Sequence, residues 1–233
     1  MVFCKKKRSS DDGELEEEYG QTWIWTAIDA ASRLLVCFFI GGRTKEDSRA
    51  FLQDLASRID SKPLFVSDEL AHYADALMEM FHDLIKPEPT GRPGRPRKAK
   101  KVAHDDLDYA TVHKTREGGR IVKVEKKVVF GSDERIQRRL EESPSSTINT
   151  SYVERSNLSW RTWDAHLTRK ALTFAKSLRW LKAKFAICIS FYNFVRPHGT
   201  LSKAKKITPA MAAKVTDHPW SIQELLECRV IRQ

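Results

Sequence analysis

Three carboxylates stand where predicted elements begin or end, and together they could hold divalent cations. Asp29 ends a strand-like segment, Asp68 follows a short buried one, and Glu154 opens a helical one. The carboxyl ends of strands are where α/β proteins place their sites. Hard cations prefer carboxylate oxygens, and two such ions activate the attacking oxygen and stabilise the leaving oxygen in phosphodiester transfer. If the three carboxylates converge, they could form a metal-dependent phosphoryl-transfer site.

Each of these residues also has a purely structural interpretation. Glu154 stands three residues after Ser151, which is the spacing of a helix capping box. Asp29 suits the turn of a hairpin, and Asp68 suits the N-terminus of a helix, where a carboxylate interacts favourably with the helix dipole. Spacing alone leaves both interpretations open.

The first third of the chain predicts an α/β order of elements. Alternating β-forming residues indicate a hairpin, and amphipathic spacing indicates two helices around a buried strand. The predicted strands cover residues 22–29, 34–41 and 64–67, and the predicted helices cover 44–60 and 71–84. Such an order predicts a mixed sheet flanked by helices.

The remaining two thirds differ in character. Residues 87–101 hold four prolines and two glycines and are typical of a linker. A hairpin is predicted from 107–115 and 120–130 around Glu117-Gly118-Gly119, followed by a charged helix over 133–142. The last third predicts a helix over 151–164 and a second over 173–195, and the second stops before Arg196-Pro197. Two short closing helices are predicted to begin at Thr208-Pro209 and at Ser221.

Composition limits the classes of function. The 233 residues are 41% hydrophobic, which is enough for a core, and the apolar run at 34–40 is far below the roughly 20 residues of a membrane span. A signal peptide is not evident, and the four cysteines are scattered, so we expect a cytoplasmic, nucleoid-associated protein.

Lys and Arg number 41 against 31 Asp and Glu, and seven bases fall within 86–101 and eight within 151–184. Clusters of this kind favour DNA as the partner.

Several motifs together resemble a known family. The strongest are Tyr-Val-Glu-Arg-Ser-Asn at 152–157, Thr-Arg-Lys-Ala-Leu-Thr-Phe-Ala-Lys-Ser at 168–177, Tyr-Asn-Phe-Val-Arg-Pro-His at 192–198 and Thr-Pro-Ala-Met-Ala-Ala at 208–213. With Trp-Ile-Trp-Thr-Ala-Ile-Asp at 23–29 and Val-Ser-Asp at 66–68, they resemble the DDE transposases of bacterial insertion elements, of the first-described insertion-sequence type. The resemblance covers nearly the whole chain.

The resemblance implies a ribonuclease-H-like fold and DNA cleavage with strand transfer. It implies Mg²⁺ or Mn²⁺ as cofactor, two ions in the active form, with Asp68 and Glu154 as the second and third catalytic acids. Its partners would be the DNA of the element ends and of the target, and the active form would be a homo-oligomer. The expected parts are a first part of the core (1–86), an insertion (87–148), the Glu-bearing and packing helices (149–201) and a C-terminal part (202–233).

Two departures from the family pattern matter. The family's first catalytic Asp lies on the first core strand, just before a segment similar to residues 2–6, where this sequence starts with Met1. Asp29 would then end the second strand, whose terminal Asp is not a metal ligand in the family, although Asp29 remains a candidate for the first acid. Glu69 replaces the glycine that usually follows the second Asp. We therefore expect a chain with poor activity by itself, and an inactive DNA-binding remnant and a ribonuclease-H-like nuclease are the alternative functions.

Two groups of basic residues are candidates for DNA contact. Residues 91–98 resemble a minor-groove AT-hook, although a flexible basic linker is an equal interpretation. The candidate contacts are Arg92, Arg95, Arg97, Lys98, Arg155, Arg161, Arg169 and Lys170. Trp160 and Trp163 could stack on bases or pack in the core. His198 could contact phosphate or cap the preceding helix.

Overall fold

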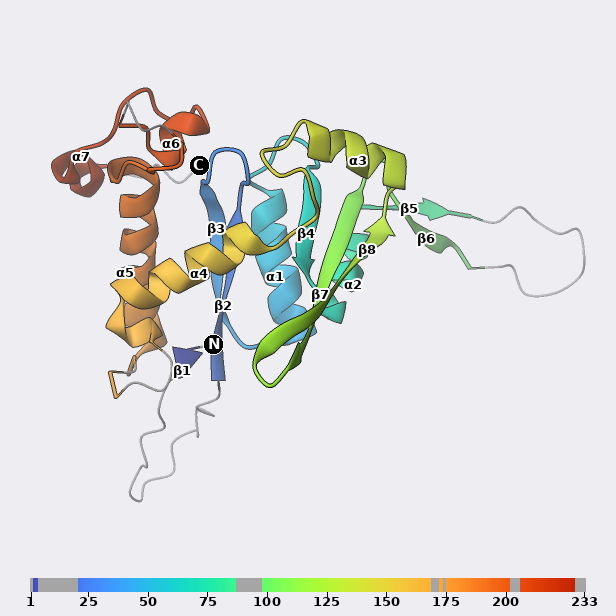
Figure 1. The fold of residues 1–233 in the computed structure, drawn as a ribbon, viewed down its shortest axis with the longest axis horizontal. Coiled ribbons are helices and arrows are strands. Elements are labelled where there is room, and N and C mark those ends of the chain that lie inside the picture. The colour runs from blue at the N-terminus through green and yellow to red at the C-terminus, as the bar shows by residue number, and fades with distance from the viewer. Residues whose placement is uncertain are drawn as a thin grey trace, which may run out of the picture. The chain divides into compact units, whose positions relative to one another are not determined.

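The chain forms a mixed α/β structure, as predicted, with several small sheets and helices against them (Figure 1). A computed structural model describes residues 2–3, 21–86, 98–168, 172–173, 175–201 and 206–228. The chain divides into two units, which we call unit 1 (Met1–Arg43 with Ser151–Gln233) and unit 2 (Thr44–Thr150). The predicted domain boundaries stay predictions, and each unit is described by itself.

The sheet of unit 1 is antiparallel, with strands in the order β1 (Val2–Phe3), β2 (Gln21–Ile28) and β3 (Leu35–Gly41). The register of the hairpin runs from Trp23 opposite Gly41 to Ile28 opposite Leu35, with one irregularity between Ala27 and Ile28. The alternating β-forming residues predicted this hairpin correctly, because such side chains pack well on a pleated surface.

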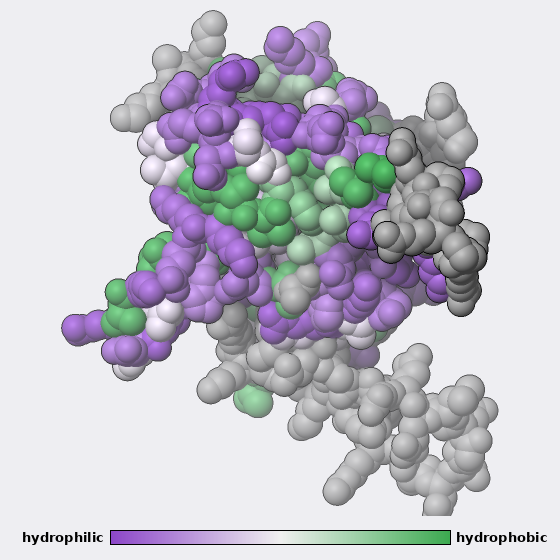
Figure 2. Space-filling view, turned by 90° about the vertical axis from the view of Figure 1, so that its right-hand side faces the viewer, coloured by the Kyte–Doolittle hydropathy of each residue, from purple (hydrophilic) through white to green (hydrophobic). Residues whose placement is uncertain are grey.

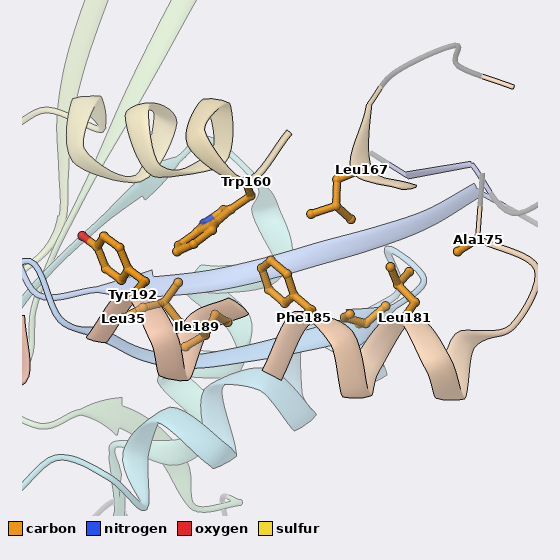
Figure 3. Close-up of a cluster of buried hydrophobic side chains, with 9 residues drawn as sticks. Leu35, Trp160, Leu167, Ala175, Leu181, Phe185, Ile189 and Tyr192 are labelled. Atoms are coloured by element: carbon orange, nitrogen blue, oxygen red, sulfur yellow. The ribbon is translucent and has the colours of Figure 1, made fainter. Parts of the chain in front are cut away.

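Two helices cover the hairpin of unit 1. The helix α4 (Ser151–Trp163) contacts β2, and α5 (Leu178–Ser190), which continues as a π-helical turn η2 (Phe191–Val195), contacts β3. Their buried apolar side chains meet in one cluster (Figure 3), formed by Leu35, Ile40, Trp160, Leu167, Ala175, Leu181, Phe185, Ile189 and Tyr192. Burial of each large apolar side chain contributes about 1.5 to 3 kcal/mol, so this cluster stabilises the packing of both helices on the hairpin.

The helix predicted over 173–195 begins later than expected. Its first residue is Leu178, since Thr173 is held elsewhere: its hydroxyl donates to the Ala165 carbonyl at 3.0 Å, and its carbonyl lies 2.9 Å from Nδ1 of His166. Phe174, part of the predicted apolar stripe, lies outside the described residues. Periodicity could not reveal these contacts with the short 3₁₀ helix η1 (Ala165–Leu167).

The two closing helices of unit 1 follow their predicted start signals. The helix α6 (Pro209–Ala212) has Thr208 as its N-cap, and the Thr208 hydroxyl accepts from the Met211 N–H at 3.3 Å. The helix α7 (Ile222–Glu227) begins with a complete capping box between Ser221 and Glu224. Cap chemistry is local, which is why the sequence alone predicted both starts.

The sheet of unit 2 combines a parallel and an antiparallel pair. Strand β4 (Leu64–Asp68) runs parallel to β7 (Asp108–Glu117), which pairs antiparallel with β8 (Arg120–Phe130). The turn of this hairpin uses Gly118 and Gly119, both with positive φ, at the predicted position. The parallel pair matters most for function, because ligands of α/β proteins gather at the carboxyl ends of parallel strands.

Three helices complete unit 2. They are α1 (Lys45–Ala56), α2 (Ala71–Met80) and α3 (Asp133–Glu141). The helix α1 begins with a capping box, in which Thr44 and Asp47 exchange hydrogen bonds. Ser132 caps α3, whose buried residues Ile136 and Leu140 face the interior of the unit.

The prediction of a helix from 71 to 84 was wrong beyond Met80. Phe81 leaves helical backbone geometry (φ −120°, ψ 68°), and β5 (His82–Ile85) then pairs antiparallel with β6 (Lys100–Ala103). This pairing joins residues on either side of 87–97, which lie outside the described residues, so no local pattern contained it. Leu84 and Ile85 are exposed on this strand pair.

Hydrophobic side chains also reach the surface of the molecule. Figure 2 shows an apolar area in the middle of one face, surrounded by hydrophilic side chains. In unit 2, the exposed apolar residues outside the β5–β6 pair include Ile121, Val122 and Val124 of β8. Val122 and Val124 are two residues apart on β8 and so lie on one face of the strand, and that part of the face is solvent-exposed.

Candidate functional site

Asp68 is the last residue of β4 and is exposed. It pairs in parallel register with Val112, so its carboxylate lies at the carboxyl end of β4 and beside the middle of β7, which continues to Glu117. The helix α2 begins only at Ala71, with Leu70 at the N-cap and no acid in its first turn. Asp68 thus precedes α2 instead of lying in its first turn, and its role as a site residue stays a prediction.

Polar side chains surround this strand end in unit 2. The hydroxyls of Ser67 and Tyr109 lie 2.8 Å apart. Burial raises the pKa of Tyr109, and the nearby charges of Asp68 and Glu69 add to that rise. The carboxylate of Glu69 lies 2.6 Å from Nδ1 of His113 on β7. The acid beside Asp68 is thus engaged by a histidine that sequence reasoning missed, since the register of β4 on β7 could not be read from the sequence.

Glu154 lies in the first turn of α4 and is exposed, whereas Ser156 and Trp160 on the same helix are buried. The helix is fixed on the hairpin partly through the side chains of Asn157 and Thr26, whose oxygens lie 3.4 Å apart. Two turns after Glu154, Arg161 is half-buried. Glu154, Asn157 and Arg161 therefore come from one helix of unit 1, as the sequence predicted.

Asp29 has a structural task in unit 1. Its carboxylate accepts a hydrogen bond from the Ser32 N–H at 2.8 Å and another from the Ser32 hydroxyl. Its backbone N–H donates to the Leu34 carbonyl at 2.8 Å, which closes the turn between β2 and β3. This is the turn role that the sequence left open, and it does not favour Asp29 as the first catalytic acid.

The three acids are not all in one unit. Asp68 belongs to unit 2, whereas Asp29 and Glu154 belong to unit 1. A site shared by Asp68 and Glu154 therefore stays a prediction. Within the described parts of the chain, no group of three or more His, Cys, Asp or Glu side chains is arranged to hold a metal ion.

The candidate DNA contacts are only partly described. Lys98 and Arg155 are exposed, and Arg161 is half-buried. The remaining candidates, Arg92, Arg95, Arg97, Arg169 and Lys170, lie outside the described residues. Trp160 is 3% exposed and packs in the core, which is the structural interpretation that the sequence offered for it.

Unit 1 also holds arginines that sequence reasoning did not select. The guanidinium carbon of Arg33 lies 3.8 Å from the ring centre of Tyr152, and that of Arg196 lies 4.1 Å from Trp163. Burial lowers the pKa of His198, and the charges of neighbouring arginines lower it further. The Arg-Pro-His motif was a signal for two of these residues, whereas nothing in the sequence singled out Arg33.

Comparison of the chain with protein-family models, with curated proteins and with solved structures finds no match. In the part of the chain that the structure describes, no helix has the length and apolarity needed to cross a membrane.

Proposed function

We propose that this chain is the catalytic core of a DNA transposase of the DDE type, with a ribonuclease-H-like fold, and that it acts on DNA as a homo-oligomer. The observation that carries the proposal is the position of Asp68, at the carboxyl end of β4 and beside the parallel strand β7. In the transposase family that the sequence resembles, the second catalytic acid lies at this position. The motif that contains Glu154 opens α4, where the third acid is expected.

The donor chemistry suits the proposed cofactor. Asp68 and Glu154 supply carboxylate oxygens, and both residues are exposed rather than buried in the core. Mg²⁺ and Mn²⁺ prefer such oxygens, and two ions bound between carboxylates would supply Lewis acidity to both oxygens of an in-line displacement. Asp68 and Glu154 would hold these ions, and the described structure does not favour Asp29 as a third ligand because its carboxylate serves the turn.

The chain's own residues would then position the DNA. Arg155 is one residue after Glu154 and Arg161 is seven after it, on the same helix α4. Guanidinium groups bind phosphate in a bidentate manner, so these side chains can fix a backbone phosphate near the acids. The net charge of +10 supports a polyanionic substrate, because counterion release favours binding.

A strand-transfer experiment tests the proposal. The protein expressed from its reading frame, together with any in-frame segment upstream of Met1, is incubated with Mg²⁺ and with DNA from both flanks of its gene. We expect joined products, and we expect Asp68→Asn and Glu154→Gln each to reduce the joining rate at least a hundredfold, because each removes a charged ligand. Glu141→Gln is the matched control, since Glu141 is an exposed helical glutamate at the end of α3. Rates unaffected by both variants would contradict the proposal.

An inactive DNA-binding remnant is the second candidate function. The observation that favours it is the commitment of the Asp29 carboxylate to the hairpin turn, because this leaves two of the three predicted acids for metal binding. In that case DNA binding persists while joining is absent from every form of the protein. Activity that is lost in Asp29→Asn but retained in Asp68→Asn would contradict both candidates.

A further inference from the structure

Three arginines of unit 1 carry charge that no carboxylate among the described residues neutralises. Arg33 lies in the turn after β2, Arg155 lies on α4, and Arg196 follows η2. In the described residues, none of the three forms an ion pair with a carboxylate. Like charges repel each other, so their gathering around one place is unfavourable until an anion binds there.

Aromatic rings hold two of these guanidinium groups in place. Arg33 lies over Tyr152 with 3.8 Å between the guanidinium carbon and the ring centre, and Arg196 lies over Trp163 at 4.1 Å. A guanidinium that stacks on a ring keeps its plane fixed while its N–H edge remains able to donate. Such arginines are preorganised for bidentate hydrogen bonding to a planar or tetrahedral anion.

Tyr192 ties the two stacked arginines to one location. Its hydroxyl donates to the Arg33 carbonyl at 3.0 Å, and its ring centre lies 6.2 Å from that of Trp163. The residue is part of the buried cluster, at the end of the row of side chains drawn in Figure 3. Arg33 and Arg196 are therefore positioned by contacts with the buried cluster of unit 1.

Arg155 lies three residues after Tyr152 on α4, and so on the same helix face as the ring that stacks on Arg33. His198 lies against the same group. Its ring centre lies 5.9 Å from that of Tyr192, and its Nδ1 lies 2.9 Å from the Thr200 hydroxyl. Burial is the largest cause that lowers the pKa of His198, and the charges of Arg33, Arg196 and Arg155 follow in that order. A neutral imidazole can donate or accept a hydrogen bond at its other nitrogen, Nε2, without adding a fourth charge.

The backbone at Arg33 is a separate observation in favour of a binding role. Its φ of +63° is left-handed, which a residue with a side chain adopts at an expense of about 1 kcal/mol. Glycine would meet the needs of the turn better. The guanidinium donates to the Ala30 carbonyl through Nη1 and stacks on Tyr152, and its remaining N–H groups can serve a further acceptor.

We propose that Arg33, Arg155, Arg196 and His198 form a site for one phosphodiester group of DNA. The assignment to DNA rests on the proposed function. The site deepens that function by adding backbone contacts outside the motif that carries Glu154. A phosphodiester supplies two free oxygens, which suit bidentate guanidinium donors. Its negative charge would offset the positive charges of the three arginines.

Salt-dependent DNA binding in EDTA tests the site without any catalysis. Fluorescence anisotropy of a labelled duplex is measured with Arg33→Gln, Arg155→Gln and Arg196→Gln. Each should weaken binding. Because the three arginines share one phosphate, the slope of log K against log salt should fall by up to about one in each variant and by no more than about one in the triple variant. Arg43→Gln is the matched control, because Arg43 also stacks on an aromatic ring of unit 1, at 4.7 Å from Trp23. Slopes that are unchanged, or equally reduced in the control, would overturn the site.

A second measurement uses the unaltered protein, so misfolding of a variant cannot obscure the result. The ring of His198 is titrated by NMR in chloride, with added inorganic phosphate, and with the duplex. Bound DNA should raise the pKa of His198, because a phosphodiester offsets the field of the arginines. A pKa that responds to inorganic phosphate but not to DNA would show a free-anion site and overturn the assignment to DNA, and no response to either would overturn the site. Because both experiments omit divalent metal, their outcome is separate from that of the strand-transfer test.

Discussion

Units 1 and 2 each contain a group of arginines, but the two groups are balanced differently. In unit 2, Arg135 and Arg139 converge on the fully buried carboxylate of Asp108. In unit 1, Arg33 and Arg196 lie against aromatic rings and have no carboxylate partner among the described residues. One group is neutralised within the chain, and the other is stacked and still charged.

The ion-pair group of unit 2 has a structural purpose. Nε of Arg135 donates to Oδ1 of Asp108 at 2.6 Å, and Nε of Arg139 lies 2.6 Å from Oδ2 as an ion pair without a well-directed hydrogen bond. The contacts fasten α3 to the start of β7. The comparison teaches that an arginine indicates a binding site less by its presence than by the lack of an internal carboxylate partner.

The largest effect should come from removing the shared carboxylate in unit 2. Asp108→Asn leaves two arginines, each about a third exposed, without their anion, and we expect the free energy of unfolding to fall by about 3 kcal/mol. Urea unfolding, followed by the circular dichroism of the helices, measures this loss. Glu141→Gln should stay within about 0.5 kcal/mol, since it is an exposed substitution. A loss below 1 kcal/mol for Asp108→Asn would mean that the pairs are dispensable and would weaken the comparison.

A slightly smaller effect is expected at the glycine that leaves room for the same carboxylate. A Cβ added at Gly131 would lie 2.2 Å from Oδ1 of Asp108, and the residue has a φ of +99°. Gly131→Ala should therefore destabilise unit 2 by about 2 to 3 kcal/mol. Gly118→Ala is the control, because its Cβ would meet open space at a φ of +55°. Equal losses for the two variants would show that backbone strain, and not the clash with Asp108, sets the effect.

Local signals made most elements predictable from the sequence. The β2–β3 hairpin, the capped starts of α1 and α7 and the turn at Gly118 depend on neighbours in the chain, and each stands where it was expected. The β5–β6 pair and the late start of α5 depend on partners distant from the pattern that was read. Pairing between residues 82–85 and 100–103 overrides helix periodicity, and so this part of the prediction was wrong.

The candidate site was predictable only in its outline. Strand-end logic placed Asp68 at the end of β4, but the same logic selected Asp29, whose carboxylate closes a turn. The pairing of Glu69 with His113 needs the register of β4 on β7, which composition cannot supply. Arg33 was missed for a similar reason, since its aromatic neighbour Tyr152 is more than a hundred positions away in the chain.

A substitution at Arg33 separates stability from binding. Arg33→Gly relieves the left-handed backbone but loses the stacking on Tyr152, and each term is about 1 kcal/mol. We expect the free energy of unfolding to change by less than about 1 kcal/mol, while the salt slope of DNA binding falls by up to about one. Thermal unfolding and anisotropy measure the two quantities on the same sample. A variant that binds DNA like the wild type would show that the strained arginine has no part in binding.

The smallest effect concerns the pH dependence of stability through His198. Burial and the charges of Arg33, Arg196 and Arg155 lower its pKa in the native chain, and no nearby carboxylate is among the causes. In the unfolded chain the residue titrates near its ordinary value of about 6.5, so the unfolded state binds the proton first as the pH falls.

His198 therefore contributes stability that is fully present above pH 6.5 and decreases as the pH falls from there towards the lower native pKa. His198→Gln should flatten this part of the curve of unfolding free energy against pH. The difference between wild type and variant isolates the contribution, because His218 acts in the opposite direction: hydrogen bonds to Asp217 and Glu224 raise its pKa in both proteins. Bound DNA should also reduce the wild-type slope, since its phosphate favours the protonated imidazole. A difference curve that rises towards acid pH would mean that His198 faces a carboxylate in solution, and the charge contrast between the two units would then not hold for unit 1.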